Sequence, residues 1–438
     1  GKPIYSKWSH ERNAILLTSV ILKDGYCVFW KERGNWNTSP VMSVQDVYPT
    51  LIGKWQVETS GQEYNYIVCL HAHDLAGIKS KYKKSLVIAI NPAFGPVEYP
   101  EHYSTIEAGA VGRKLASALS NDIDYVTCQN PRMLDLAKIF YRNLTSYGPE
   151  DERFINCFFG FENIALPLDG FDRHSVRSRY GIKDDEILII NSGGVWKWTD
   201  MLTFAQGYVL HVKNNPGTKI KIAFMGWSQL ENRDHDEYIN KVKKVLSEIQ
   251  DANKIIAIDN WEEASLLVDT FLRISDFGVN VNKHTLEDWQ SHRVRALDYL
   301  RYKLPFISTG GDFLSAEKLA KFIIKVSASN VASYANMFDE INAGNYSDIV
   351  DKLPVDFFDQ FDANITLASF VHLLPSLTTR DIKFFDFKSA SLEFNSLNLI
   401  QKIKLKIKKY FHKNKNKTLL GKVMNLKLLK FFGKKLIG

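Results

Sequence analysis

Short β-rich runs alternate with amphipathic helical segments along residues 187–326, and this alternation constrains the fold more than any other feature of the chain. Strands that alternate with helices in this way form parallel βαβ units. We therefore expect a doubly wound α/β domain in the second half of the chain. Its predicted strands are 187–191, 219–225, 254–258, 277–281 and 305–308, and its predicted helices are 200–213, 236–250, 262–274, 293–303 and 315–326.

The first half of the chain shows the same alternation less regularly, and 438 residues is the length of two domains. Its predicted strands are 66–71, 86–90, 124–128 and 155–159, and its predicted helices are 9–23, 104–120 and 131–143. The expected fold class is α/β, with two Rossmann-like doubly wound domains in tandem. We expect domains over 1–165 and 166–345, helices over 346–400 that pack back on the body, and a basic helical tail over 401–438.

The formal net charge of +7 conceals two parts of opposite sign. Residues 401–438 contain 13 lysines and no acidic residue, so the rest of the chain carries 43 basic and 49 acidic side chains. An evenly basic chain would indicate nucleic-acid binding, whereas this body is mildly acidic. No apolar run approaches the roughly 20 residues that a membrane-spanning helix needs.

The four cysteines, Cys27, Cys69, Cys128 and Cys157, are far apart and form no CxxC pair. The last three lie in apolar, strand-like runs. Reduced core thiols in a cytosolic protein are therefore favoured over disulfides or a metal site.

Ligands of doubly wound sheets bind beyond the carboxyl ends of the strands, so the loop at 191–200 is a candidate site. Two glycines allow the backbone to approach a ligand, and amides at a helix start favour anions such as a pyrophosphate. A lysine would add charge, and a tryptophan would stack on a base or sugar. The alternative is a tight turn with a simple helix cap and tryptophans that fill a domain interface. The candidate binding residues are Gly193, Gly194, Trp196, Lys197, Trp198 and Asp200.

A second loop, 284–300, gathers two arginines, two histidines and three carboxylates around a predicted helix start. Arg293 and Arg295 point about 200° apart on a helix, so they do not both face one ligand. The fork of Arg293 suits a phosphate or carboxylate, and Arg295 would pair with a nearby acid. Asp298 would accept hydrogen bonds from hydroxyls such as those of a ribose. The alternative is a solvated helix start with intrahelical ion pairs.

These two loops resemble those of a known enzyme family. The string GGVWKWTDMLT at 193–203, followed by HTLEDWQSHRVRALDYLRYKLPFISTGGD at 284–312, is similar to a subgroup of bacterial retaining glycosyltransferases. These family 4-like enzymes (glycosyl transferases group 1) have the two-domain GT-B fold and are often encoded with O-antigen, capsule or other surface-polysaccharide machinery. The resemblance covers roughly 65–330 and is strongest over 187–315.

The resemblance implies a nucleotide-sugar donor held mainly by the second domain, in the cleft between the domains. Glu287 and Arg293 would be the catalytic residues, with Glu287 on the sugar hydroxyls. Asp298 would bind the ribose. Gly193 and Gly194 would hold the diphosphate together with the cationic residues Lys197, Arg293 and Arg295. The E-x7-E spacing of the broader family is not kept, because Arg295 stands eight residues after Glu287. The first strand and glycine-rich loop that normally precede the first helix are not found before 9–23.

The chemistry follows from charge, because cleavage of the anomeric bond leaves negative charge on the diphosphate. Preorganised amides, Arg and Lys would stabilise that charge, so we expect no metal and no other cofactor. Candidate acceptor-side residues are His71, His73, Glu98 and His102. For each of these an ordinary surface role is the alternative, and a metal site at His71 and His73 is disfavoured.

The expected activity is sugar transfer with retention, of the hexosyltransferase type, from a nucleotide-sugar to a glycan or lipid-linked glycan. A GT-B sugar-nucleotide epimerase and a degenerate, non-catalytic scaffold are the alternatives. The sequence leaves open the sugar, the nucleotide and the acceptor.

The tail at 401–438 alternates lysines with apolar residues at near-helical spacing. A basic amphipathic segment of this kind lies in a membrane interface. We therefore expect a cytoplasmic protein held at the inner face of the cell membrane through anionic lipids, and no nucleic-acid partner. Nucleic-acid binding and a plain solubilising role are the alternatives for this segment.

Overall fold

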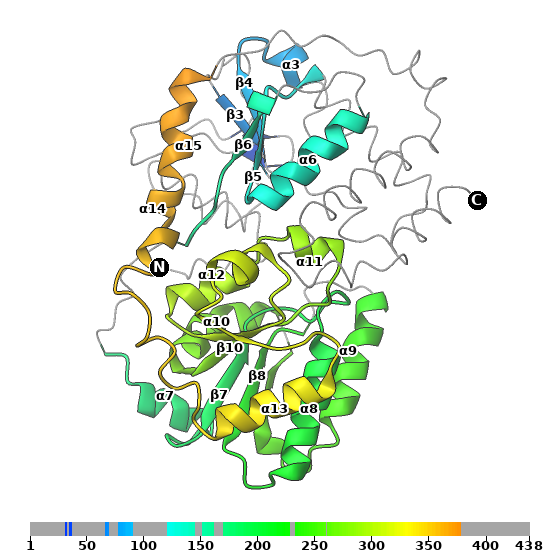
Figure 1. Cartoon of the computed structure of the whole chain (residues 1–438), viewed down its shortest axis with the longest axis vertical. Helices are drawn as coiled ribbons and strands as arrows, with labels where there is room; N and C mark the ends of the chain where they lie inside the picture. Colours follow the sequence, from blue (N-terminus) through cyan, green and yellow to red (C-terminus); the bar gives the residue numbers. More distant parts are fainter. Residues whose placement is uncertain are drawn as a thin grey trace, which may run out of the picture.

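The computed structural model of the chain describes nine stretches, and together they form two α/β halves (Figure 1). The described residues are 31–32, 35–36, 66–69, 78–90, 121–144, 151–161, 170–227, 233–259 and 261–377. Several predictions fall outside them: the helices at 9–23 and 104–120, the acceptor-side candidates His71, His73, Glu98 and His102, and the tail at 401–438.

The second half is built on a six-stranded sheet in which every neighbouring pair is parallel, with the order β12-β11-β10-β7-β8-β9. The chain starts in the middle at β7, runs outward to β9, and returns to the other side of β7 at β10. This is the doubly wound strand order, with a switch point between β7 and β10. The strands are β7 Ile187–Asn191, β8 Ile220–Met225, β9 Ile255–Ile258, β10 Phe277–Asn280, β11 Phe306–Ser308 and β12 Ile323–Lys325.

Both faces of this sheet are covered, and β7 is accordingly apolar at consecutive rather than alternate positions from residue 187 to residue 190. Ile189 faces a core formed with α8, α9 and α13, whereas its neighbours Leu188 and Ile190 face a core formed with α10 and α12. Apolar residues of α8 recur at helical spacing, from Met201 to Tyr208, and face the sheet. The helices are α7 Arg173–Arg179, α8 Met201–Asn214, α9 Arg233–Leu246, α10 Trp261–Ile274, α11 Leu286–Gln290, α12 Val294–Arg301 and α13 Val331–Asn342.

The first half contains a parallel four-stranded sheet with the order β3-β4-β5-β6. Cys128 and Cys157 are both free thiols buried in this half, as the sequence predicts for them. The elements are β3 Tyr66–Cys69, α3 Ile78–Lys81, β4 Leu86–Ile90, β5 Tyr125–Cys128, α6 Pro131–Leu144 and β6 Phe154–Asn156, and a separate two-stranded hairpin joins β1 Lys31–Glu32 to β2 Asn35–Trp36.

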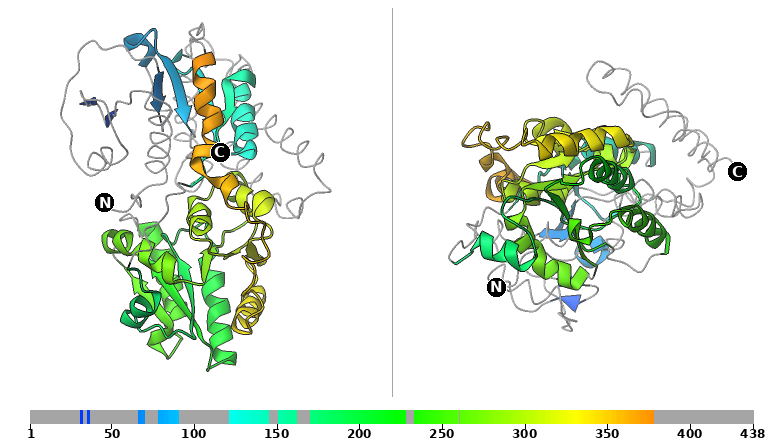
Figure 2. Two further views of the ribbon diagram at one scale, coloured as in Figure 1. Left: turned by 90° about the vertical axis from the view of Figure 1, so that its left-hand side faces the viewer. Right: turned by 90° about the horizontal axis from the view of Figure 1, so that it is seen from below.

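The chain returns to the first half after α13, through α14 (Ala363–Thr366) and α15 (Ala368–Leu373), which cross from the lower to the upper part of the molecule (Figure 2). Leu367 and Phe370 pack into one apolar core with Leu86 and Tyr125 of the first sheet. The crossing point is fixed by backbone hydrogen bonds, since Phe161 N donates to Phe361 O over 2.8 Å.

Each predicted strand is observed with ends within two residues of the predicted ones, except that β6 ends at Asn156 instead of residue 159. The α/β class with two parallel sheets is confirmed. One predicted helix is wrong. Within 315–326 a short π-helical turn, Leu314–Lys318, is followed by β12. Ile323 and Ile324 pair with Phe306 and Ile307 of β11, so β-branched residues at a sheet edge prevailed over helical periodicity.

Gly160 provides a test of the crossing between the halves. A β-carbon on Gly160 would lie 2.0 Å from Phe361 O, a backbone atom that is already hydrogen-bonded. We expect Gly160→Ala to cost about 1–3 kcal/mol and to lower the melting temperature by several degrees, because the returning chain must shift. Gly217→Ala is the matched control, since a β-carbon there meets nothing within 4 Å. Equal melting temperatures for the two variants would contradict the tight crossing.

Candidate functional site

The two loops singled out in the sequence lie side by side at the switch point of the six-stranded sheet. Asp200 N donates to Val281 O over 3.1 Å, and Lys283 N donates to Trp198 O over 2.9 Å. Between these bonds, Thr199 and Asn282 form an antiparallel bridge. The loops after β7 and β10 therefore form one continuous surface where ligands of doubly wound sheets bind.

Tyr299 of α12 closes the gap where β7 and β10 end. Its hydroxyl lies 3.1 Å from Ile190 O and 3.0 Å from Val279 O, and it accepts a hydrogen bond from the Ser192 hydroxyl at 3.2 Å. The side chain is fully buried, and burial raises the pKa of Tyr299. Tyr299 thus joins α12 to the ends of both strands.

The loop at 191–200, called the glycine loop below, is held in shape by Arg295. Its guanidinium donates to Asn191 Oδ1 at 2.8 Å and to Gly194 O at 3.0 Å. A β-carbon on Gly193 would lie 2.8 Å from Arg295 Nη2, so the close approach of the guanidinium requires glycine there. Burial lowers the pKa of Arg295. In this arrangement Arg295 fixes the shape of the loop, and its predicted contact with a donor stays a prediction.

The two tryptophans of this loop stack on each other, with ring centroids 5.0 Å apart and planes 6° from parallel. Trp196, Lys197 and Trp198 are all half-buried. Each therefore keeps some exposed surface in the loop where a donor is expected.

Asp200 is buried and fully engaged within the protein. Its Oδ1 accepts from the Thr203 hydroxyl at 2.7 Å, and its Oδ2 accepts from Ser329 N at 2.6 Å and the Tyr334 hydroxyl at 2.9 Å. These bonds join the start of α8 to the start of α13. Asp200 therefore has a structural role, and donor binding by this residue stays a prediction.

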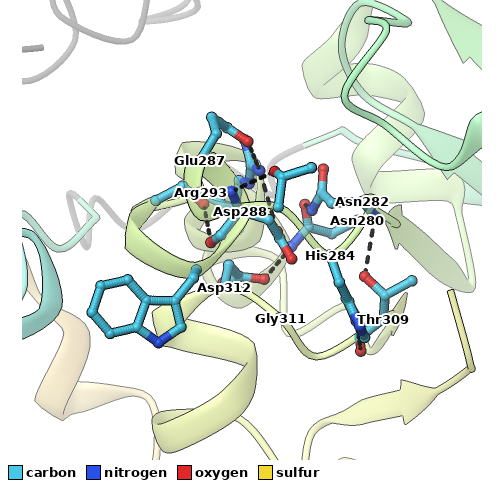
Figure 3. A network of polar contacts seen from close by, with 12 residues as sticks. Asn280, Asn282, His284, Glu287, Asp288, Arg293, Thr309, Gly311 and Asp312 are labelled. Atoms are coloured by element: carbon cyan, nitrogen blue, oxygen red, sulfur yellow. Dashed lines mark hydrogen bonds and ion pairs between the residues drawn. The ribbon is translucent and has the colours of Figure 1, made fainter. Parts of the chain in front are cut away.

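Glu287 and Arg293 form a two-pronged ion pair (Figure 3). Arg293 Nη1 and Nη2 donate to Glu287 Oε1 and Oε2, each over 2.8 Å, and Nη2 also lies 3.2 Å from Asp288 Oδ1. Burial would lower the pKa of Arg293, but the two carboxylates outweigh it and raise that pKa. The structure thus brings together the two residues predicted to be catalytic.

Asp288, beside this pair, is a site residue that the sequence did not single out. It is fully buried, and its Oδ2 lies against Gly311 with no hydrogen-bond partner among the described residues. Burial raises the pKa of Asp288 to about 8, a shift that Arg293 opposes and Asp312 reinforces. Asp312 is itself held by Asn280 Nδ2, at 3.2 Å. Below that pH Asp288 is protonated and adds no negative charge beside the Glu287–Arg293 pair.

The remaining polar residues of the second loop lie around this cluster. Asp298 is buried on α12, one turn after Arg295, and its predicted ribose contact stays a prediction. His284 Nε2 lies 3.2 Å from Thr309 O. His292 Nε2 donates to Phe159 O of the first half at 2.8 Å, and burial lowers the pKa of His292 to about 4, so that its ring is neutral at physiological pH.

Two further residues of the first half reach this cluster, and the sequence analysis missed both. Asn130 Nδ2 donates to Gln290 O at 2.9 Å, and Arg132 Nη1 donates to Trp289 O at 3.1 Å and to Gly311 O at 2.9 Å. Both follow the end of β5, as Asn-Pro-Arg at the start of α6. Polar residues directly after a strand of the first sheet were the signal available in the sequence.

Within the described stretches, no group of three or more His, Cys, Asp or Glu side chains is arranged to hold a metal ion. No helix in that part of the chain has the length and apolar character needed to cross a membrane.

The buried carboxyl of Asp288 predicts a pH dependence. Its folded pKa of about 8 lies above the ordinary value of 3.8, so its contribution to stability is full below about pH 4 and is lost as the pH rises through 8. We expect the free energy of unfolding of Asp288→Asn to rise relative to that of the wild type as the pH increases over this interval, by up to about 1.4 kcal/mol per pH unit. Denaturant unfolding between pH 5 and 9 measures the difference. Asp351→Asn, at an exposed carboxylate, is the control, and a difference for Asp288→Asn that stays constant with pH would contradict the assignment.

No protein-family model matches the chain, and no curated protein sequence matches it. Solved structures do match it in shape. HepE from Anabaena in complex with UDP has a TM-score of 0.53 at 11% identity, covering 72% of this chain and 79% of that chain. A glycosyltransferase from Rickettsia africae has a TM-score of 0.53 at 12% identity, covering 84% of this chain and 94% of that chain. The trehalose-6-phosphate synthase OtsA has a TM-score of 0.51 at 13% identity, with 72% of each chain covered.

At these identities the likeness concerns the fold. The matched structures are GT-B glycosyltransferases, and they share with this chain the arrangement of two parallel sheets with covering helices. The chain therefore has the GT-B fold.

Proposed function

We propose that the chain is a retaining glycosyltransferase, which moves a sugar from a nucleotide-sugar donor to a glycan or lipid-linked glycan acceptor. The observation that carries this proposal is the meeting of the glycine loop and the Glu287 loop at the switch point, on the side that contacts the first half. A donor there would be held by the second half and open toward an acceptor from the first. Synthesis of O-antigen, capsule or another surface polysaccharide is the role we propose from the sequence resemblance.

The diphosphate would bind at the glycine loop, where the charges favour an anion. The loop leads into α8 at Met201, and α12 begins nearby at Val294, so the positive ends of two helix dipoles lie around it. Lys197 belongs to the same loop. Backbone amides and helix ends that are fixed before the donor binds would stabilise the charge that develops as the anomeric bond breaks.

Glu287 would bind the hydroxyls of the donor sugar. Arg293 holds both of its oxygens from one side, so the direction of the carboxylate is fixed. Each oxygen still has a lone pair for a sugar hydroxyl, since a carboxylate has about four acceptor sites. Arg293 in this arrangement acts on the donor through Glu287 rather than on the diphosphate.

The donor is identified first by thermal shift of the full chain, because a ligand that binds the native state raises the melting temperature. UDP and UDP-glucose are sensible first probes, since HepE was solved with each of them. We then expect Glu287→Gln to lower the rate of transfer about 100-fold, as loss of one electrostatic contact in the transition state does, while the melting-temperature shift with the nucleoside diphosphate is kept.

Glu263→Gln, at an exposed carboxylate on α10, is the matched control for this experiment and should transfer at the wild-type rate. A Glu287→Gln variant that is equally fast would refute the site. Release of free nucleoside diphosphate with a glycosylated acceptor distinguishes a transferase from an epimerase.

We also propose that residues 401–438 attach the protein to anionic membranes, since each lysine near such a surface adds about 1 kcal/mol of attraction. We expect the full chain to float with vesicles containing phosphatidylglycerol at low salt. Replacing five of the 13 tail lysines by glutamine should weaken flotation clearly, since about 5 kcal/mol of attraction is removed. Those five are Lys422, Lys427, Lys430, Lys434 and Lys435, and the control replaces five lysines exposed on the body, Lys83, Lys84, Lys183, Lys241 and Lys244. Equal flotation of the two variants would contradict attachment through the tail.

A further inference from the structure

The helix that carries Glu287 and Asp288 is short and is held at its two ends by different halves of the molecule. Helix α11 has five residues, Leu286–Gln290, and Thr285 caps its start by accepting from Asp288 N at 3.2 Å. At its other end, Trp289 O and Gln290 O accept hydrogen bonds from side chains of the first half, Arg132 and Asn130. A helix of this length is marginal alone, because its last carbonyls have no partner within it.

Asn130 is placed to reach α11 because it also caps its own helix. Its Oδ1 accepts from Met133 N at 2.9 Å, which is the bond of a helix cap, and its Nδ2 then points outward to Gln290 O at 2.9 Å. Pro131, at the first position of α6, fixes the backbone in this orientation. The side chain of Asn130 is fully buried, so breaking this bond would leave a buried amide unsatisfied.

Arg132 ties α11 to the neighbouring loop. Its Nη1 donates both protons, one to Trp289 O and one to Gly311 O. Its Nε donates to Glu317 Oε1 at 3.0 Å, and its guanidinium lies 5.5 Å from the Trp289 ring centroid. The charge is thus almost entirely buried among partners of the second half, and the loops after β10 and β11 are held together by one side chain of the first half.

We propose that Asn130 and Arg132 are positioning residues that complete α11 when the two halves dock, and that they thereby place the Glu287 carboxylate for reaction. This proposal rests on the proposed function for the role of Glu287, but the docking contacts stand independently of it. The consequence is that the acceptor half of the enzyme controls the geometry of the donor-sugar contact. Binding of the nucleoside diphosphate at the glycine loop does not depend on these two residues.

Two variants of the full chain test the proposal. Asn130→Asp keeps the cap of α6, since Asp is an equally good capping residue, but it replaces the donor to Gln290 O by an acceptor. Arg132→Met keeps much of the apolar side chain and removes all the donors. The matched control is Arg173→Met, because Arg173 also donates to a carbonyl, Ile274 O, and pairs with a carboxylate, but within its own half.

Hydrogen–deuterium exchange of peptides spanning α11 is the first measurement, and it needs neither ligand nor activity. We expect exchange to be about tenfold faster in Asn130→Asp and Arg132→Met than in the wild type and Arg173→Met, because a lost hydrogen bond to a buried group frees the end of the helix. Unchanged exchange in both variants overturns the proposal. If Arg132→Met does not fold, Asn130→Asp decides the matter.

Kinetics with the donor that the wild type accepts is the second measurement. We expect kcat to fall about tenfold in both variants while the donor KM stays within about twofold, since the interaction lost acts on the transition state rather than on binding. An unchanged kcat together with faster exchange overturns the positioning role. A wild type that turns over no nucleotide-sugar would contradict the proposed function instead, and the exchange data would still decide whether docking completes α11.

Discussion

The hydroxyl of Tyr299 joins the ends of β7 and β10, and the arrangement of both candidate loops depends on that junction. In a parallel sheet, the place where the strand order reverses is where the connections after two neighbouring strands leave in opposite directions, and ligands bind there. Here that place lies between β7 and β10, where the Tyr299 hydroxyl contacts Ile190 O and Val279 O. Because Tyr299 belongs to α12, the same helix that carries Arg295 is anchored to both strands, and Arg295 can reach Asn191 and Gly194.

The charges of the site follow from this anchored framework. The loop that would receive the diphosphate lies near two helix starts, and Arg295 supports it from behind. Beside it, the Glu287 carboxylate is neutralised by Arg293, and burial keeps Asp288 protonated below about pH 8. A second buried negative charge next to a diphosphate would oppose binding, so a protonated Asp288 suits the donor that the proposal requires.

The fold was predictable from the sequence to the extent that it depends on local pattern. The run ILII at 187–190 is apolar at every position, which a strand covered on both faces requires, and β7 is observed at Ile187–Asn191. The strand β12 was missed because its two isoleucines follow a π-helical turn closely. They form a strand only because they pair with β11.

Site residues that belong to one loop could be predicted from the sequence. Contacts between segments that are distant in sequence could not. The sequence grouped Glu287 with Arg293, and the structure shows them paired. The contact of Arg132 with Gly311 could not be predicted, because local sequence pattern does not indicate which strand ends of one half face which loops of the other half. The structural contacts of Asp200 and Arg295 were likewise not predictable from the sequence, since each side chain is hydrogen-bonded to a residue that is distant in sequence.

The central claim is that the loops after β7 and β10 form the donor site. It is tested most directly by a crystal structure of the full chain with the nucleoside diphosphate that binds it. The account predicts density for the diphosphate over Gly193 and Gly194, with its terminal phosphate directed toward Glu287. A diphosphate bound away from both loops, with Glu287 and the glycine loop untouched, would contradict the account.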